Sequence, residues 1–164
     1  MRELRLVAEH DWDAIKSIYE EGIRTRNATF QTEAPTQESW FNGHVLDSSL
    51  VCVQDGIVVG WASLSLISSR CVYSGVAEVS VYVKEDVRGN GVGSDLLNEL
   101  VRYSEKNGFW TLQAGIFPEN ESSVKLHMKH GFQVVGRRER LGKMDDRWRD
   151  VLLLERRSTV VGID

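Results

Sequence analysis

The chain has 164 residues, 41% hydrophobic and 27% charged, with a formal net charge of −4. This composition predicts one domain spanning residues 1–164, and the acidic balance argues against a nucleic-acid partner. The sequence has no apolar run long enough for a membrane span and no secretory leader at its N-terminus, so we expect no membrane partner and a cytoplasmic location.

The first half of the chain shows clear helical and strand patterns. Isoleucines at helical spacing follow Asp11, which we expect to cap the helix, and Asp55-Gly56 is a strong hairpin signal between two apolar runs. We predict a strand at 2–8, a helix at 11–24, an ordered loop at 25–35, a helix at 36–46 and a hairpin of strands at 49–54 and 57–66. Cys52 and Cys71 match no metal spacing and are interpreted as reduced and structural.

The second half surrounds a glycine-rich stretch. We predict a strand at 76–83, a helix at 94–107 that ends before Gly108, a strand at 110–117, a helix at 119–130, and strands at 132–139 and 148–156, with a loose tail from Ser158. The fold class is therefore α/β (α+β): a mixed, mostly antiparallel sheet of about six or seven strands flanked by about four helices.

The glycine-rich stretch Arg88-Gly89-Asn90-Gly91-Val92-Gly93 joins the predicted central strand to a helix. Bare backbone before a helix N-terminus suits a phosphate group, because unpaired N–H groups and the positive end of the helix dipole meet there. The stretch lacks the lysine of a P-loop, and Ser94 takes the sixth position of a dinucleotide fingerprint. A glycine-rich turn without a ligand is the alternative.

The remaining pattern, Arg88-x-x-Gly91-x-Gly93, resembles the coenzyme A pyrophosphate loop of the GNAT superfamily of N-acetyltransferases. The resemblance implies the GNAT fold, acetyl-CoA as cosubstrate and no metal. It also implies that two central strands splay apart and free the backbone of Val81 and Val83 for the cofactor. The cofactor-binding residues would be Val81, Val83, Arg88, Gly89, Asn90, Gly91, Val92, Gly93, Ser94, Asn120 and Ser123.

A second stretch narrows the resemblance. Asn120, Ser123 and His127 share one face of the predicted helix, and His127 stands where the superfamily commonly has tyrosine. With the segments 29–33, 113–120 and 148–151, this pattern resembles the phosphinothricin acetyltransferase branch. That branch usually forms homodimers. It implies direct acetyl transfer to the primary amine of a small amino-acid-like acceptor, of the phosphinothricin or methionine sulfoximine type.

Strand alternation places Glu78, Ser80 and Tyr82 on one face of the central strand. The resemblance implies that Glu78 is the general base, and a salt bridge with an arginine is the alternative. His127 would share the base role, relay a proton or donate one to the leaving thiolate, or be an ordinary core histidine. Tyr82 would donate to the thiolate or the carbonyl, or bond to backbone instead.

An acceptor carboxylate or phosphinate needs a cation, best an arginine. Arg70 with Tyr73 is the first choice, and Arg26 with Phe30 is the second; each arginine is equally readable as a solvated loop residue. Two other functions stay open at this point: acetylation of a protein N-terminus or lysine, and a non-catalytic coenzyme A-binding sensor.

Overall fold

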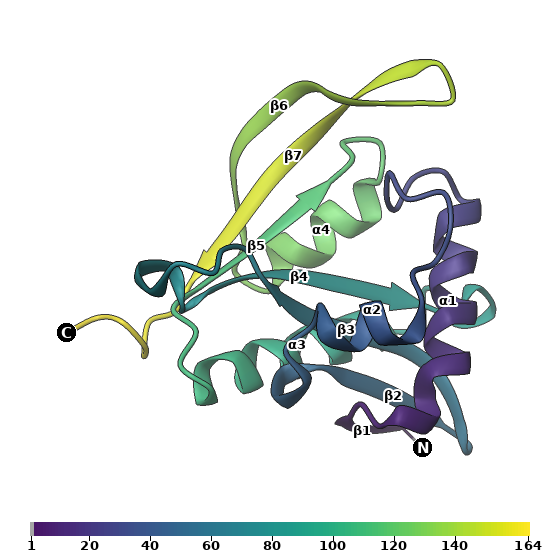
Figure 1. The fold of residues 1–164 in the computed structure, drawn as a ribbon, viewed down its shortest axis with the longest axis horizontal. Coiled ribbons are helices and arrows are strands. Elements are labelled where there is room, and N and C mark those ends of the chain that lie inside the picture. The colour runs from purple at the N-terminus through teal and green to yellow at the C-terminus, as the bar shows by residue number, and fades with distance from the viewer. Residues whose placement is uncertain (1) are drawn as a thin grey trace.

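Seven strands form one sheet in the order β1-β2-β3-β4-β5-β7-β6 in the computed structural model, which describes residues 2–164 (Figure 1). The only parallel pair in this part of the chain is β4 with β5, so the mostly antiparallel sheet expected from the sequence is confirmed. The strands are β1 (Arg2–Leu6), β2 (Leu50–Gln54), β3 (Ile57–Leu66), β4 (Val76–Val83), β5 (Thr111–Ile116), β6 (Gln133–Met144) and β7 (Arg147–Arg157).

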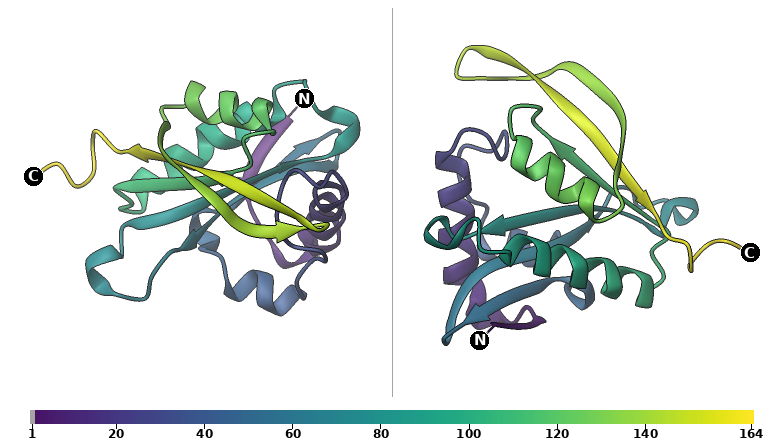
Figure 2. Two further views of the ribbon diagram at one scale, coloured as in Figure 1. Left: turned by 90° about the horizontal axis from the view of Figure 1, so that it is seen from above. Right: turned by 180° about the vertical axis from the view of Figure 1, so that it is seen from behind.

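Four α-helices of the described chain cover the two faces of the sheet. Helices α1 (Trp12–Arg24) and α2 (Gln37–Asn42) lie on one face, and α3 (Val92–Lys106) and α4 (Glu121–Lys129) lie on the other (Figure 2). Leu96, Leu97 and Leu100 of α3 are fully buried against the strands, as their spacing predicts. On the opposite face, Ile15 and Ile18 of α1 pack with Trp40 and Trp61.

The Asp55-Gly56 hairpin is confirmed. Both residues have positive φ, 52° and 79°, and the flanking strands β2 and β3 pair antiparallel. Two successive left-handed residues are what a type I′ turn requires, because that turn matches the twist of the strands.

Two expectations about element ends were wrong. Asp11 does not cap α1 with its side chain; its buried carboxylate accepts a hydrogen bond from the Ala8 amide and two from the Arg5 guanidinium. The helix expected at 36–46 is shorter than predicted, because α2 has only six residues and ends before Gly43. Helix α3, by contrast, begins at Val92, directly after Gly91, so the glycine-rich stretch leads into a helix N-terminus as expected.

Strand β6 extends well beyond its predicted end at residue 139, whereas β7 matches its predicted bounds to within one residue at each end. They continue as a two-stranded ribbon to a turn at Asp145 and Asp146, both with positive φ (Figure 1). Residues 137–140 on this ribbon are exposed, and the missing apolar alternation after residue 139 concealed the rest of β6. The tail is tied at its start, because the Ser158 hydroxyl bonds to Glu105 and accepts from the amides of Val160 and Val161.

The sheet opens between β4 and β5. The two strands pair only from Val76 to Glu78 on β4 and from Thr111 to Gln113 on β5. Beyond that point β4 continues to Val83 beside β3 in unbroken register, so no bulge shifts its side-chain alternation. The result is a wedge with the remainder of β4 on one side and the end of β5 and α4 on the other.

Candidate active site

One end of the wedge is a cleft of about 520 Å³ beside the glycine loop. Gly89 and Gly91 have φ values of 85° and 86°, a left-handed conformation that favours glycine. A Cβ at Gly89 would have no other atom within 4 Å, so the loop borders open space. Because α3 starts at Val92, the amides of its first turn have no partner within the helix.

The backbone of β4 also faces this opening. The Lys84 amide donates to the Val59 carbonyl on β3, and backbone groups alternate sides along a strand. The amides and carbonyls of Val83 and Val81 therefore point away from β3, toward the wedge. The Val83 carbonyl accepts a hydrogen bond from Arg88 Nε, which agrees with this direction.

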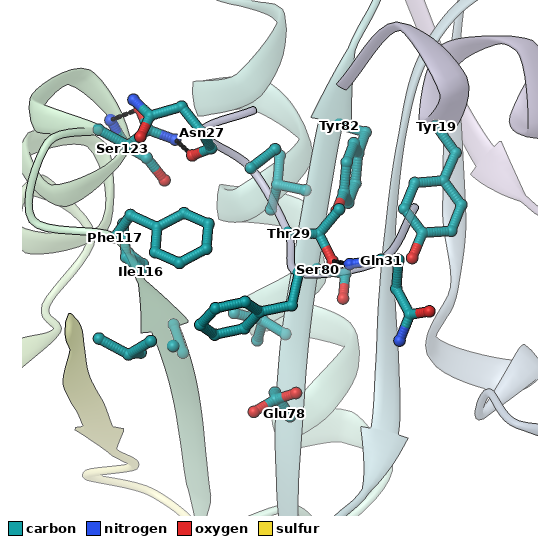
Figure 3. Close-up of a pocket in the computed structure, with 18 of the residues that line it drawn as sticks. Tyr19, Asn27, Thr29, Gln31, Glu78, Ser80, Tyr82, Ile116, Phe117 and Ser123 are labelled. Atoms are coloured by element: carbon teal, nitrogen blue, oxygen red, sulfur yellow. Dashed lines mark hydrogen bonds between the residues drawn. The ribbon is translucent and has the colours of Figure 1, made fainter. Parts of the chain in front are cut away.

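A second cavity, of about 440 Å³, occupies the other part of the wedge. Glu78, Ser80 and Tyr82 project into it from β4, as the alternation predicts, while Thr29 and Gln31 reach it from the loop after α1 (Figure 3). Its remaining walls are largely aromatic and include Tyr19, Phe30, Trp40, Trp61 and Phe117.

Glu78 is half-buried in this second cavity and has no hydrogen-bond or ion-pair partner among residues 2–164. The alternative interpretation, a salt bridge with a nearby arginine, is therefore wrong for the described chain. A carboxylate that lines a cavity without a partner is available to accept a proton or a hydrogen bond from a ligand.

His127 on α4 is 4% exposed and also lines this cavity. Its Nδ1 lies 2.7 Å from the Ser123 carbonyl oxygen, which only accepts, so Nδ1 carries the proton and Nε2 presents a lone pair. Burial lowers the pKa of His127 from its ordinary value of 6.5. The ring is therefore neutral at neutral pH and acts as an acceptor at Nε2.

Tyr82 is held within an aromatic stack. Its ring stacks on Trp61 at 4.7 Å and meets the edge of Tyr19 at 4.9 Å. A Cβ on Gly22 of α1 would lie 2.6 Å from the Tyr82 ring, so glycine at that position lets the helix pack against it. Burial raises the pKa of Tyr82 well above its usual value, which keeps the phenol protonated.

Comparison with known proteins decides the family. The family model for the acetyltransferase (GNAT) domain matches residues 4–153. The chain belongs to the GNAT family of acetyltransferases. It is therefore an acetyl-CoA-dependent N-acetyltransferase, as the glycine stretch led us to expect.

Individual relatives of this N-acetyltransferase cover nearly its whole length. YwnH of Bacillus subtilis is 39% identical over 93% of this chain and 97% of its own. Phosphinothricin N-acetyltransferase of Alcaligenes faecalis is 32% identical over 93% of this chain and 81% of its own. A phosphinothricin acetyltransferase from Sinorhizobium meliloti, solved in complex with acetyl-CoA, superimposes with a TM-score of 0.88 at 28% identity, over 99% of this chain and 91% of that one.

Most of the predicted site residues of this N-acetyltransferase come together. Every predicted cofactor-binding residue except Asn90 lines the cleft. Asn90 instead accepts a hydrogen bond at its backbone oxygen from Arg2. Glu78, Tyr82, His127 and Phe30 all line the second cavity.

The predicted acceptor cations of the N-acetyltransferase do not reach that cavity. Arg70 and Tyr73 are exposed on the loop between β3 and β4, where Arg70 lies over the Tyr73 ring at 5.8 Å. That loop precedes β4 and so stands at the opposite end of the strand from the glycine loop (Figure 1). Arg26 lies in a separate depression, 3.4 Å from the Asp145 carboxylate. No lysine or arginine of the described chain lines the second cavity.

Sequence reasoning missed His44, which lines the same cavity of the N-acetyltransferase. Its Nδ1 lies 2.7 Å from the Trp40 carbonyl oxygen, its ring packs against Trp40 at 4.3 Å, and burial lowers its pKa. The sequence signal that could have revealed His44 is Gly43: a glycine there can end the helix, and the side chain after it then no longer follows the helical pattern.

Among residues 2–164 no group of His, Cys, Asp or Glu is arranged to hold a metal, and no helix there is long and apolar enough to cross a membrane.

Proposed function

We propose that this enzyme transfers the acetyl group of acetyl-CoA directly to the primary amine of a small amino-acid-like acceptor, of the phosphinothricin or methionine sulfoximine type. The observation that carries the proposal is the junction of the two cavities: Val81, Tyr82, Asn120 and Ser123 line both. A thioester held in the cleft would thus present its carbonyl where an amine in the second cavity can attack it. The activity in the name of the Alcaligenes faecalis relative supports this acceptor class.

The cleft has the features that acetyl-CoA needs. Amides of the first turn of α3, reached through Gly89 and Gly91, would bind the diphosphate, with Arg88 adding positive charge. The outward backbone groups of Val81 and Val83 would hydrogen-bond the pantetheine arm and orient the thioester. Acetyl-CoA supplies an activated acyl group with a thiolate as leaving group.

Glu78 would remove a proton from the acceptor ammonium, because only the free amine has a lone pair. The nitrogen then forms its bond to the carbonyl carbon, and the C–S bond breaks. The nitrogen loses its second proton, which would pass to the departing thiolate so that coenzyme A leaves as the free thiol. The neutral His127 fits a second acceptor or a relay better than a donor, since its pKa is lowered. Tyr82, whose phenol stays protonated, would donate a hydrogen bond to the oxyanion or the thiolate.

The acceptor anion is best held by a cation, and no lysine or arginine of residues 2–164 lines the second cavity. We propose a homodimer in which a second copy brings Arg70 and Tyr73 to this region; Arg26 is the alternative within the chain. The exposed apolar side chains around Arg70 support a covered surface there: Leu66, Ile67, Val72 and Tyr73 are 43–67% exposed. We further propose a cytoplasmic, single-domain enzyme without nucleic-acid or membrane partners.

An acceptor screen with the purified protein tests the function. Free thiol release from acetyl-CoA is measured with phosphinothricin, methionine sulfoximine, the common amino acids, and peptides with free N-termini or lysines. We expect turnover with phosphinothricin, methionine sulfoximine or the free amino acids, since a cavity of about 440 Å³ suits a small acceptor. Turnover of peptides alone would instead establish a protein acetyltransferase, and binding without any turnover would favour the sensor.

A further inference from the structure

The segment 25–31, here called the partition loop, separates the two cavities. Asn27 and Ala28 line both of them. The side-chain hydrogen bonds within the loop only close short local turns: the Asn27 amide donates to Thr25 Oγ1 and the Gln31 amide donates to Thr29 Oγ1. Arg26 has a positive φ of 59°, a conformation that costs a non-glycine residue free energy. The position of the partition loop therefore depends on contacts made from outside it.

Arg149 on β7 makes two of those contacts. Its Nη1 donates to the Arg26 carbonyl oxygen and its Nη2 to Asn27 Oδ1, each at 2.9 Å. Asn120, at the start of α4, adds a third by donating from Nδ2 to the Asn27 carbonyl oxygen at 3.1 Å. A guanidinium that donates through both terminal nitrogens fixes orientation as well as distance.

Arg149 is itself held rigidly. Its Nη2 lies 3.0 Å from the Glu119 carboxylate, and its Cζ lies 3.9 Å above the centre of the Phe117 ring. Phe117 in turn meets the edge of Phe30 at 4.9 Å. Both phenylalanines line the second cavity, so the Arg149 side chain joins the partition loop to this aromatic wall.

We propose that Arg149 is a positioning residue for the acceptor: it sets the partition loop and the Phe30–Phe117 wall and does not touch the reacting atoms. Arg149 does not line the second cavity, and its side chain is only 12% exposed. The cofactor cleft has walls of its own in β4, the glycine loop and α4, so the loss of Arg149 acts on the acceptor first. The inference rests on the proposed function for its kinetic part.

Three variants of the full-length protein test the inference. Arg149→Met keeps the apolar stem on Phe117 but removes all donors, and Arg149→Lys keeps the charge beside Glu119 but loses the fork. Arg147→Met is the matched control. Arg147 lies two residues earlier on β7 and is exposed, and its side chain has no hydrogen-bond or ion-pair partner in the described chain. For each variant we would measure kinetics, coenzyme A affinity by titration calorimetry, thermal melting, and amide hydrogen exchange across residues 25–31.

We expect Arg149→Met to raise the acceptor KM by about tenfold to a hundredfold, as misplaced binding groups do. Its kcat should stay within about threefold, because the lost contacts bind ground state and transition state alike. Arg149→Lys should show a smaller rise in the acceptor KM than Arg149→Met. Amide hydrogen exchange in the partition loop should accelerate in Arg149→Met and not in the control Arg147→Met. Coenzyme A affinity should change less than the acceptor KM.

Three outcomes would overturn the inference. They are an unchanged acceptor KM in folded Arg149→Met, equal effects in Arg147→Met, and loop exchange that rises only in step with exchange over the whole chain. If the wild type releases no thiol with any acceptor, the proposed function fails by itself. The exchange comparison then still decides whether Arg149 holds the loop.

Discussion

Replacing Glu78 by glutamine separates chemistry from folding more cleanly than other changes in the site. The carboxylate has no hydrogen-bond or ion-pair partner in residues 2–164, so an amide of the same shape breaks no contact within the chain. The free energy of unfolding should therefore change by less than about 0.5 kcal/mol. A general base typically contributes about 10²–10⁴ in rate, so kcat should fall by that factor, or about 3–5 kcal/mol of activation free energy.

The assay is thiol release from acetyl-CoA with a saturating acceptor, beside a thermal melt and a coenzyme A titration. Asp11→Asn provides the contrasting control, because that buried carboxylate accepts two hydrogen bonds from Arg5 and one from the Ala8 amide. It should lose about 1.5–3 kcal/mol of stability and melt about 3–12 °C lower while the folded fraction keeps its kcat. A Glu78→Gln enzyme with kcat within about threefold of wild type would refute the base assignment.

Three further predictions concern His127, the cofactor cleft and the acceptor anion. His127→Asn keeps a donor to the Ser123 carbonyl but removes the Nε2 lone pair, and should lower kcat/KM by about tenfold or more; an unchanged rate would remove His127 from the chemistry. Burial lowers the folded-state pKa of His127 below 6.5. Its contribution to the free energy of unfolding is therefore complete above pH 6.5 and declines as the pH falls below that value. Urea titrations at several pH values should show a smaller loss of unfolding free energy at low pH in the variant than in the wild type. Gly93→Val, at a position without positive φ, should raise the coenzyme A Kd by about tenfold. Some loss of melting temperature is expected too, because a Cβ there would lie 3.2 Å from Leu126 Cδ2 and that side chain must shift, but replacing Gly91, with its φ of 86°, would strain the fold more. Equal loss of binding and stability at Gly93 would contradict the cradle. Arg70→Ala should raise the acceptor KM by about tenfold and leave the KM of acetyl-CoA unchanged. Sedimentation of the wild-type protein should show a dimer, and a monomeric wild type would exclude this role of Arg70.

The sequence was informative where local physics alone determines structure. The Asp55-Gly56 turn, the side-chain alternation at Glu78 and Tyr82, and the glycine approach to α3 all depend on residues close together in the chain. Each of them was predicted correctly, and the last two supply residues that line the two cavities.

The remaining features depend on contacts between distant segments. Asp11 resembles a helix cap in sequence, but Arg5 and the Ala8 amide compete for its carboxylate, and tertiary pairing prevails. The segment 148–151 carries part of the family resemblance, but nothing local shows what Arg149 contacts, because its partners lie 122 and 30 residues away. Arg70 precedes the central strand, yet closeness in sequence to β4 does not bring its side chain into the second cavity.

The departure of β5 from β4 leaves main-chain groups in the middle of the sheet without a neighbouring strand. On the proposed function, the pantetheine arm takes the place of that missing neighbour. Main-chain groups are the same whatever side chain a codon specifies. The acceptor pocket can therefore accumulate substitutions at Ser80 or in the aromatic wall while the cosubstrate stays bound, which lets acceptor preference diverge among descendants of one scaffold.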